Sequence, residues 1–457
     1  MEAAALIIVL VIALALFFDF TNGFHDTANA MATPIATGAL KPKVAVLLAA
    51  VLNLVGAFLS TEVAKTISGG MIREDQIDSA IFPAIIFAGL IGAITWNMLT
   101  WLLGLPSSSS HALFGGLIGA TLVGVGAAAI DFSVVMSKVI LPAVIAPLTA
   151  GIIAYTATKI AYVVTRRYDS KPDGRDGFRI GQIFTSSLVA LAHGTNDAQK
   201  TMGVITLLLI TAGFQSASDP DPQTWVVFAC AITIALGTYM GGWRIIRTLG
   251  KGLTDVKPAQ GFSAESSTAA TILASSALGF ALSTTQVASG SVIGSGLGRR
   301  GSTVRWRMVF RIMVGWLLTL PAAGAVGAAA ALVVVWFGMW GILVDAVLAV
   351  LVILSIFLRS RRNAVTASNA MSEVADSGRA VKVKRNPPPT RRQRAIQREE
   401  QRREAEEAAR VKAESKAAER RATEERARVA ATAKQAAKEK AKADARRGAD
   451  KNGGGSL

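Results

Sequence analysis

The sequence has little of the cysteine and of the charge that soluble domains of this size carry. Cys230 is its single cysteine, which excludes an intramolecular disulfide and a thiolate metal cage. Charged residues make up 17% of the chain, below the roughly 25% that is typical of soluble domains. The signatures G-x-x-x-x-G-K-[ST], H-E-x-x-H and G-x-S-x-G do not occur. We therefore predict a protein that is not an enzyme, needs no cofactor, carries no ATP-driven pump domain and offers no certain metal site.

In place of charge, the chain carries long apolar runs. Apolar residues make up 51% of the sequence, and the mean hydropathy is +0.43. Several runs exceed the roughly 18 residues that a membrane helix needs. Residues 3–18 form the first run, and we interpret them as a retained membrane helix because Met1-Glu2 lacks the positive start of a signal peptide. The pattern predicts an all-α polytopic membrane protein with about 10–12 membrane segments, about eleven by direct count.

Loop charges predict how these segments are oriented. Under the positive-inside rule, loops rich in Lys and Arg lie in the cytoplasm, and the acidic loops lie outside. This places the N-terminus outside and the C-terminal tail in the cytoplasm of a multi-pass plasma-membrane protein. The basic loops are residues 41–43, 165–180, 244–257 and 299–307, and the acidic loops are residues 61–79 and 214–223.

The formal net charge of +17 belongs mostly to the C-terminal tail. Residues 359–457 hold 27 of the 48 Lys and Arg residues and 14 of the 31 acidic residues. From residue 391 onward Ala, Glu, Lys and Arg dominate, which favours helix, but the regular apolar seam of a coiled coil is missing. We interpret the tail as a solvated, partly helical appendage, with contact to anionic membrane lipid as the alternative. We expect no nucleic-acid partner.

Polar side chains interrupt two of the apolar runs, at Thr21–Ala32 and Leu191–Gly203. A charged side chain at the centre of a membrane helix costs about 2.5–3.5 kcal/mol on insertion scales. Such residues usually pair with each other, face a cavity or bind a ligand, so both stretches are candidate functional segments. The polar residues of the second stretch include His193, Asn196, Asp197, Gln199 and Lys200.

The two polar stretches match each other, and each is followed by a Ser/Thr turn. Gly23–Asn29 aligns with Gly194–Lys200, and Ser108–His111 aligns with Ser283–Gln286. The spacing between the aspartate and the first serine of the turn is 82 residues in the first half and 86 in the second. Because the loop charges turn the two halves in opposite directions, we predict an inverted-topology repeat with discontinuous helices and two Ser/Thr-turn hairpins.

This repeat divides the chain into four predicted parts. Two transmembrane repeats are joined by a basic cytoplasmic loop, and a basic tail rich in Ala, Glu, Lys and Arg follows the second repeat. In secondary transporters of this architecture, the substrate lies near the midplane between the repeats. The parts are the first repeat (residues 1–164), the loop (165–180), the second repeat (181–358) and the cytoplasmic tail (359–457).

The residue types predict neighbouring sites for an anion and for cations. Hydroxyl groups and free backbone N–H groups at a helix start suit an oxyanion. The predicted anion contacts are Ser108, Ser109, Ser110, Ser283, Thr284 and Thr285. Carboxylates have the wrong sign for an anion, but together with amide oxygens they suit a proton, Na⁺ or a metal ion. The predicted coupling-cation residues are Asp26, Asn29, Asn196, Asp197 and Gln199.

Five further polar residues suit either a functional or a structural role. His111 and His193 suit proton handling, or they are hydrogen-bonded core residues. Lys200 either pairs with Asp197 or neutralises the anion. A single intramembrane aspartate can also be a packing device, and a serine run can be a helix interface. The residues predicted for proton handling or charge balance are His25, His111, His193, Lys200 and Gln286.

At these residues the chain resembles the Pit family of inorganic phosphate transporters. That family carries a G-A-N-D-x-A-N-type signature in each half and a Ser/Thr turn downstream of each signature. The matching stretches here are NGFHDTANA (residues 22–30), LPSSSSHAL (105–113), AHGTNDAQK (192–200) and ALSTTQVA (281–288). The resemblance covers residues 5–357 and points to the bacterial low-affinity, proton-coupled branch, its actinobacterial members in particular.

The resemblance implies symport of inorganic phosphate with a cation, a proton first and Na⁺ second. It implies that the Ser/Thr turns hold phosphate between the halves, that the aspartate motifs bind the cation, and that some members carry phosphate as a neutral divalent-metal complex. His25 stands where the signature has Asn, which favours protons over Na⁺, and Gln286 replaces the His that usually ends the second turn. The alternatives are a sulfate permease of the same family, a non-transporting phosphate sensor and a channel.

Overall fold

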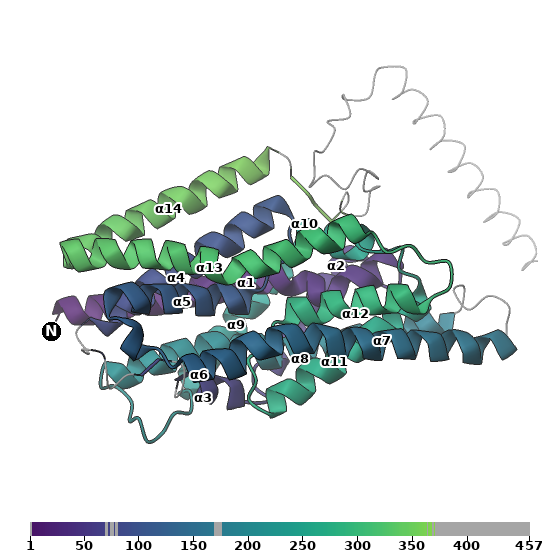
Figure 1. Ribbon diagram of the computed structural model, residues 1–457, viewed down its shortest axis with the longest axis horizontal. Helices are drawn as coiled ribbons and strands as arrows, with labels where there is room; N and C mark the ends of the chain where they lie inside the picture. Colours follow the sequence, from purple (N-terminus) through teal and green to yellow (C-terminus); the bar gives the residue numbers. More distant parts are fainter. Residues whose placement is uncertain are drawn as a thin grey trace, which may run out of the picture. The chain divides into compact units, whose positions relative to one another are not determined.

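Helices that are far apart in the sequence pack side by side around the two polar motifs. The computed structural model describes residues 2–68, 72–73, 77, 81–168, 176–362, 364–367 and 370 (Figure 1). Within these residues the regular structure consists of helices and two isolated β-bridges. In chain order the elements are α1 (Glu2–Ala36), α2 (Pro42–Gly56), α3 (Glu62–Ser68), α4 (Phe82–Leu103), α5 (Ser109–Gly124), η2 (Ala127–Ala129), α6 (Phe132–Val134), η3 (Val135–Ile140), α7 (Leu141–Tyr168), α8 (Asp176–Thr211), α9 (Thr224–Met240), α10 (Trp243–Arg247), η5 (Thr248–Gly252), α11 (Pro258–Ala277), α12 (Thr284–Gly298), α13 (Trp306–Phe337) and α14 (Met339–Arg361).

The aspartate motifs do not interrupt their helices. α1 continues for 35 residues through Asp26, and α8 continues for 36 residues through Asp197. The prediction of discontinuous helices is therefore wrong for these two elements. A continuous helix satisfies its own backbone in hydrocarbon, so only the polar side chains need partners. A break does occur in the second half, where α9 and the segment Trp243–Gly252 are bent by 56°.

Each Ser/Thr turn starts a helix in the same way. α4 ends at Gly104, whose φ of 65° favours glycine. The hydroxyl of Ser108 then caps α5 by accepting a hydrogen bond of 3.1 Å from the N–H of His111. Ser283 caps α12 by accepting one of 3.3 Å from the N–H of Gln286. The two predicted turns are thus matched helix starts, and α4 packs on α5 as α11 packs on α12.

Glycines let α5 and α12 lie close to helices of the other half. Figure 1 shows α5 beside α13 and α12 beside α7. A Cβ atom added at Gly119 would lie 2.1 Å from the carbonyl oxygen of Gly324, and one added at Gly294 would lie 2.0 Å from that of Gly151. Contacts this short require the absence of a side chain, as in small-residue packing between membrane helices.

The helices that carry the two aspartates, α1 and α8, also contact helices of the other half at glycines. A Cβ atom at Gly23 of α1 would lie 2.3 Å from the carbonyl oxygen of Ile234 in α9. A Cβ atom at Gly194 of α8 would lie 2.2 Å from the carbonyl oxygen of Asn53 in α2. Gly23 and Gly194 are aligned positions of the two motifs, so the two halves repeat their packing as well as their sequence.

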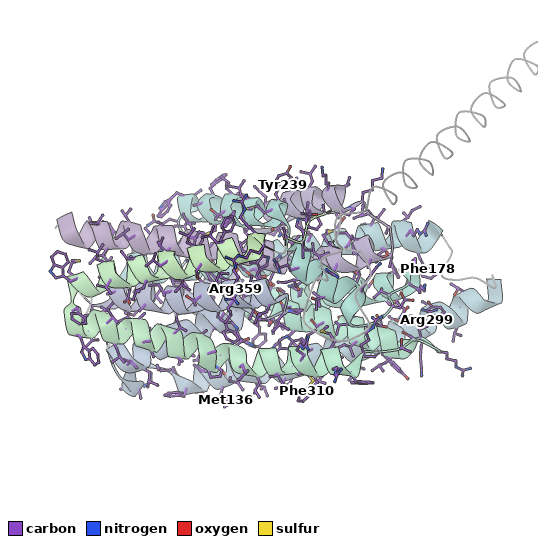
Figure 2. All side chains as sticks on the ribbon, turned by 90° about the horizontal axis from the view of Figure 1, so that it is seen from above. Met136, Phe178, Tyr239, Arg299, Phe310 and Arg359 are labelled. Atoms are coloured by element: carbon purple, nitrogen blue, oxygen red, sulfur yellow. The ribbon has the colours of Figure 1, made fainter. Side chains whose placement is uncertain are left out.

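The outer face of the bundle is apolar, as in a membrane protein. Met136 and Tyr239 are each 58% exposed and Phe310 is 69% exposed, and Figure 2 shows these residues at the rim of the bundle. Among the described residues, five helices are long and apolar enough to cross a membrane, or six if the bent pair is one span. α2 and α5 are shorter apolar helices. The protein is therefore an all-helical, multi-span membrane protein, while the count of eleven segments stays a prediction.

Several loop and tail predictions fall on residues without a described structure. Residues 169–175 of the predicted cytoplasmic loop lie outside the described residues, as do residues 69–71, 74–76 and 78–79 of the acidic loop. The tail from residue 371 onward lies outside them as well. The interpretation of these segments therefore stays a prediction.

The glycine packing makes a direct prediction about stability. We expect Gly119→Ala to lower the free energy of unfolding by about 1–3 kcal/mol, because the added methyl group overlaps the α13 backbone. Gly315→Ala in α13 is the matched control, since its Cβ atom would have no neighbour within 4 Å. Melting temperatures of both variants in detergent test this expectation. Equal melting temperatures for Gly119→Ala and wild type would contradict it.

Candidate ion and anion site

Asp26 lies buried in α1 and accepts hydrogen bonds from two other helices. Ser109 of α5 donates to Oδ2 at 2.7 Å, and Thr285 of α12 donates to Oδ1 at 3.1 Å. Nδ1 of His25 lies 2.7 Å from Oδ1, and Nε2 of His193 lies 3.9 Å from Oδ2. Within the described part of the chain, the ion-pair partners of Asp26 are these two imidazoles, with no Lys or Arg among them.

Asp197 lies buried in α8 and has a lysine as its ion-pair partner. Nζ of Lys200, one turn further along the same helix, contacts Oδ1. Nε2 of His193 lies 2.5 Å from Oδ2, and Thr284 of α12 donates to Oδ2 at 3.0 Å. The two aspartates thus differ, because Asp197 is paired with an ammonium group and Asp26 is not.

The N-termini of α5 and α12 converge at these carboxylates. The hydroxyl of Ser110 in the first turn of α5 donates at 3.1 Å to the carbonyl oxygen of Leu282, which directly precedes the cap of α12. The first N–H groups of a helix have no partner inside it and carry partial positive charge. Two such ends repel each other unless negative charge lies nearby. Asp26 and Asp197 supply that charge, and the donors at the two helix starts suit an anion.

The six residues predicted to contact the anion divide into two groups. The hydroxyls of Ser108 and Ser283 accept hydrogen bonds as helix caps. The other four hydroxyls face the charged groups of α1 and α8, through contacts with Asp26, Asp197 or Lys200. These four are Ser109, Ser110, Thr284 and Thr285.

Asn29 and Asn196 each bring an amide to the same region. Asn29 donates to Thr285 at 3.0 Å, and Asn196 donates to Ser276 at 2.9 Å. The Oδ1 atoms of both asparagines are buried with no hydrogen-bond partner within the described residues. Buried acceptors without a partner are rare. Both oxygens are therefore available as cation ligands.

Gln199 does not turn its carbonyl oxygen toward the aspartates. Its Oε1 accepts hydrogen bonds from the N–H groups of Val63 at 2.7 Å and Ala64 at 3.2 Å, at the start of α3. Its Nε2 donates to the carbonyl oxygen of Thr195 in its own helix. In this arrangement the oxygen of Gln199 caps α3, and its role as a cation ligand stays a prediction.

His111 and Gln286, which occupy aligned positions in the two turns, contact each other. Nε2 of Gln286 lies 3.4 Å from Nδ1 of His111. Both residues also line a cavity of about 950 Å³, whose other walls are mainly apolar side chains of α7, α12 and α13. Such a lining does not suit a phosphate ion.

Asp26, His193 and Asp197 form a group that could hold a metal ion. One ligand atom from each of these buried residues lies within 4.8 Å of the others. The donor set contains two carboxylates and one imidazole, which divalent transition metals accept. His193 thus contacts both aspartates, and its predicted part in proton handling stays a prediction.

Several buried polar residues near the site were not predicted. Nε2 of His25 lies 3.3 Å from Ser107 and 3.4 Å from Thr100. Nδ1 of His193 lies 3.4 Å from Oδ1 of Asn53 in α2. Asn53 is a lone polar residue in the apolar run 44–60, so the sequence did contain a signal for it. Ser107 belongs to the same serine run as the predicted anion contacts.

Among the described residues, three buried acids also lie outside the predicted set, namely Asp19, Glu265 and Asp345. Asp19 of α1 accepts a hydrogen bond of 3.0 Å from Thr201 of α8, which ties the two aspartate helices together. Glu265 of α11 accepts from Thr33, from Gln182 at 3.1 Å and from Thr185 at 2.8 Å. An acid inside an apolar helix is a signal in itself, but its hydrogen-bond partners cannot be found from the sequence.

A multi-span bundle with two converging helix starts and buried aspartates is the arrangement of a membrane transport protein. Residues 22–327 match the model of the phosphate transporter family. The chain belongs to this family, so it is a transporter and not an enzyme, as predicted.

Curated relatives and one solved structure support this assignment. The chain is 54% identical over 374 residues to a protein of Mycobacterium bovis described as a probable low-affinity inorganic phosphate transporter, covering 82% of this chain and 88% of that protein. A Bacillus subtilis protein of the same description is 40% identical, covering 72% of this chain and 98% of its own length. The fold matches a solved sodium-dependent phosphate transporter with a TM-score of 0.60 and 24% identity, covering 72% of this chain and 99% of that one.

The matched helix caps predict matched losses of stability. We expect Ser108→Ala and Ser283→Ala each to lower the free energy of unfolding by about 1 kcal/mol, because each removes the acceptor for a first-turn N–H group. Ser137→Ala is the control, since its exposed hydroxyl donates back to Ser133 in its own helical segment. Thermal unfolding in detergent measures all three. A loss confined to one cap would contradict the equivalence of the two turns.

Proposed function

We propose that the protein moves inorganic phosphate across the plasma membrane together with a cation, which we take to be a proton. The observation that supports this most is the convergence of two helix N-termini at two buried carboxylates. One structure then offers donors for an oxyanion and acceptors for a cation. Moving the two together offsets the charge that each would otherwise carry into a medium of low dielectric constant.

In this proposal the anion binds at the starts of α5 and α12. Two kinds of uncharged donor would contact it there. They are the first N–H groups of both helices and the hydroxyls of Ser109, Ser110, Thr284 and Thr285. In the structure three of these hydroxyls donate to the aspartates. A cation or proton on the carboxylates would release these donors for phosphate, which couples the two ligands.

The coupling cation binds at Asp26 in this proposal. Asp197 is already paired with Lys200, whereas the ion-pair partners of Asp26 in the described chain are imidazoles. Burying a carboxylate without a Lys or Arg beside it costs several kcal/mol, so Asp26 is the group that gains most from an added cation. Two further groups assist Asp26 in binding the cation, namely His25 at 2.7 Å and the amide oxygen of Asn29.

We also propose that the two halves form an inverted repeat around this site. The aligned turns cap α5 and α12 alike, and the aligned glycines Gly23 and Gly194 pack on α9 and α2. Each aspartate-bearing helix thus packs on a helix of the other half, which suits two repeats of opposite direction. The loop charges then place the N-terminus outside and the tail in the cytoplasm.

A divalent metal-phosphate complex is a second candidate for the transported species. The group formed by Asp26, His193 and Asp197 favours it, because these ligands suit a metal ion that enters with the anion. In that case the metal is cargo. His193→Gln would then lose stimulation by divalent metal while proton-driven uptake of free phosphate persists.

Uptake of labelled phosphate into proteoliposomes tests the proposal. We expect accumulation above equilibrium when the outside is made acidic, because protonation of the carboxylate then favours entry. The assay is run with and without Na⁺ and Mg²⁺, and with sulfate as competitor. Binding without accumulation under any gradient would indicate a sensor. Flux that never exceeds equilibrium would indicate a channel, and preferred uptake of sulfate would indicate a sulfate permease.

The two aspartates should be essential for coupling. We expect Asp26→Asn and Asp197→Asn each to reduce coupled uptake by roughly 100-fold or more, because each removes a buried charge from the site. Asp345→Asn is the matched control, since this buried carboxylate lies on α14 at the edge of the bundle. Uptake by Asp26→Asn at the wild-type rate would remove Asp26 from the mechanism.

A further inference from the structure

We propose that Lys200 is a tethered cation that permanently fills the cation position beside Asp197, so that one mobile cation, bound beside Asp26, accompanies each phosphate. This rests on the proposed symport function and adds the number and kind of ions that the site takes. The evidence is the ligand set around the Lys200 ammonium group and its comparison with the matched position in the first half.

The ammonium group of Lys200 sits in a ligand set that a small metal cation would accept. Nζ contacts the carboxylate of Asp197, the hydroxyl of Ser110 at 2.6 Å and the carbonyl oxygen of Leu282 at 3.0 Å. A carboxylate, a hydroxyl and a backbone carbonyl are the hard oxygen ligands of such ions. An ammonium group has three donors, so these three oxygens satisfy it completely.

Asn29 holds the matched position in the first half but brings no charge. It follows Asp26 by three residues, as Lys200 follows Asp197. Its amide nitrogen lies 3.0 Å from the hydroxyl of Thr285, which is the residue aligned with Ser110. The contact between Lys200 and Ser110 is thus repeated in the first half, with a neutral amide in place of the ammonium group. Within the described residues, the buried Oδ1 atom of Asn29 has no hydrogen-bond partner.

The two positions therefore differ in whether they need a cation from solution. The position at Asp197 contains its own positive charge, and a second cation there would be repelled by it. The position at Asp26 contains a carboxylate, a hydroxyl and an unpartnered amide oxygen, and the titratable groups facing it are His25 and His193. An external cation is required at this second position only.

Replacing Lys200 by the residue of the other half tests this assignment. We expect Lys200→Asn to open the second position, so that uptake without Na⁺ falls by roughly 100-fold and added Na⁺ restores it. Radioactive sodium should then enter together with labelled phosphate. Wild type should accumulate phosphate equally with and without Na⁺. Thr211→Ala at the end of the same helix is the control and should keep the wild-type ion dependence, because its hydroxyl donates to Leu207 and Leu208 of α8 itself.

The outcomes separate this inference from the proposed function. If wild type accumulates no phosphate under any gradient, the symport function fails. If wild type accumulates phosphate but folded Lys200→Asn is still independent of Na⁺, or is inactive even with Na⁺, the tethered cation is wrong. Size-exclusion profile and melting temperature establish folding. If the variant does not fold, the number of sodium ions carried with each phosphate is measured on wild type. Cotransport of two sodium ions with each phosphate would also overturn the inference.

Discussion

The site depends on one electrostatic constraint, the meeting of two positive helix ends inside a membrane protein. Ser110 of α5 reaches the carbonyl oxygen of Leu282, directly before the cap of α12. Without negative charge this approach would be repulsive, and hydrocarbon would not screen it. Asp26 and Asp197 supply the charge from two helices that cross at the same place. The same carboxylates then hold the hydroxyls that would face an anion.

The constraint explains why the polar residues are tolerated. Each carboxylate accepts from hydroxyls of helices other than its own, so its burial is compensated by hydrogen bonds that exist only in the folded bundle. The helices that carry the aspartates stay continuous, which leaves their backbones satisfied. The glycine contacts of α5 with α13 and of α12 with α7 fix the helix starts from the opposite side. Tight packing behind the site and hydrogen bonds in front of it together hold the two ends near each other.

The sequence allowed much of this to be predicted, because the cost of burying polar groups is a local property. A carboxylate in an apolar run, repeated with matched spacing, was enough to predict that Asp26 and Asp197 share a site with the two Ser/Thr turns. The turn residues Ser108 and Ser283 could be placed at helix starts for the same reason. The class of protein and the family followed from these features and are confirmed by the comparisons.

The direction of individual side chains could not be predicted, and this decided what each residue does. Gln199 and Lys200 are neighbours in one motif, yet Gln199 caps α3 while Lys200 turns to Asp197. A step of one residue on a helix rotates the side chain by about 100°, and only the positions of α3 and α5 show which face receives a partner. The same holds for Asn53 and Ser107, whose roles depend on helices that the sequence does not place. The chemistry of the site could thus be predicted from residue types, whereas the difference between the surroundings of Asp26 and Asp197 required the packing of the whole bundle.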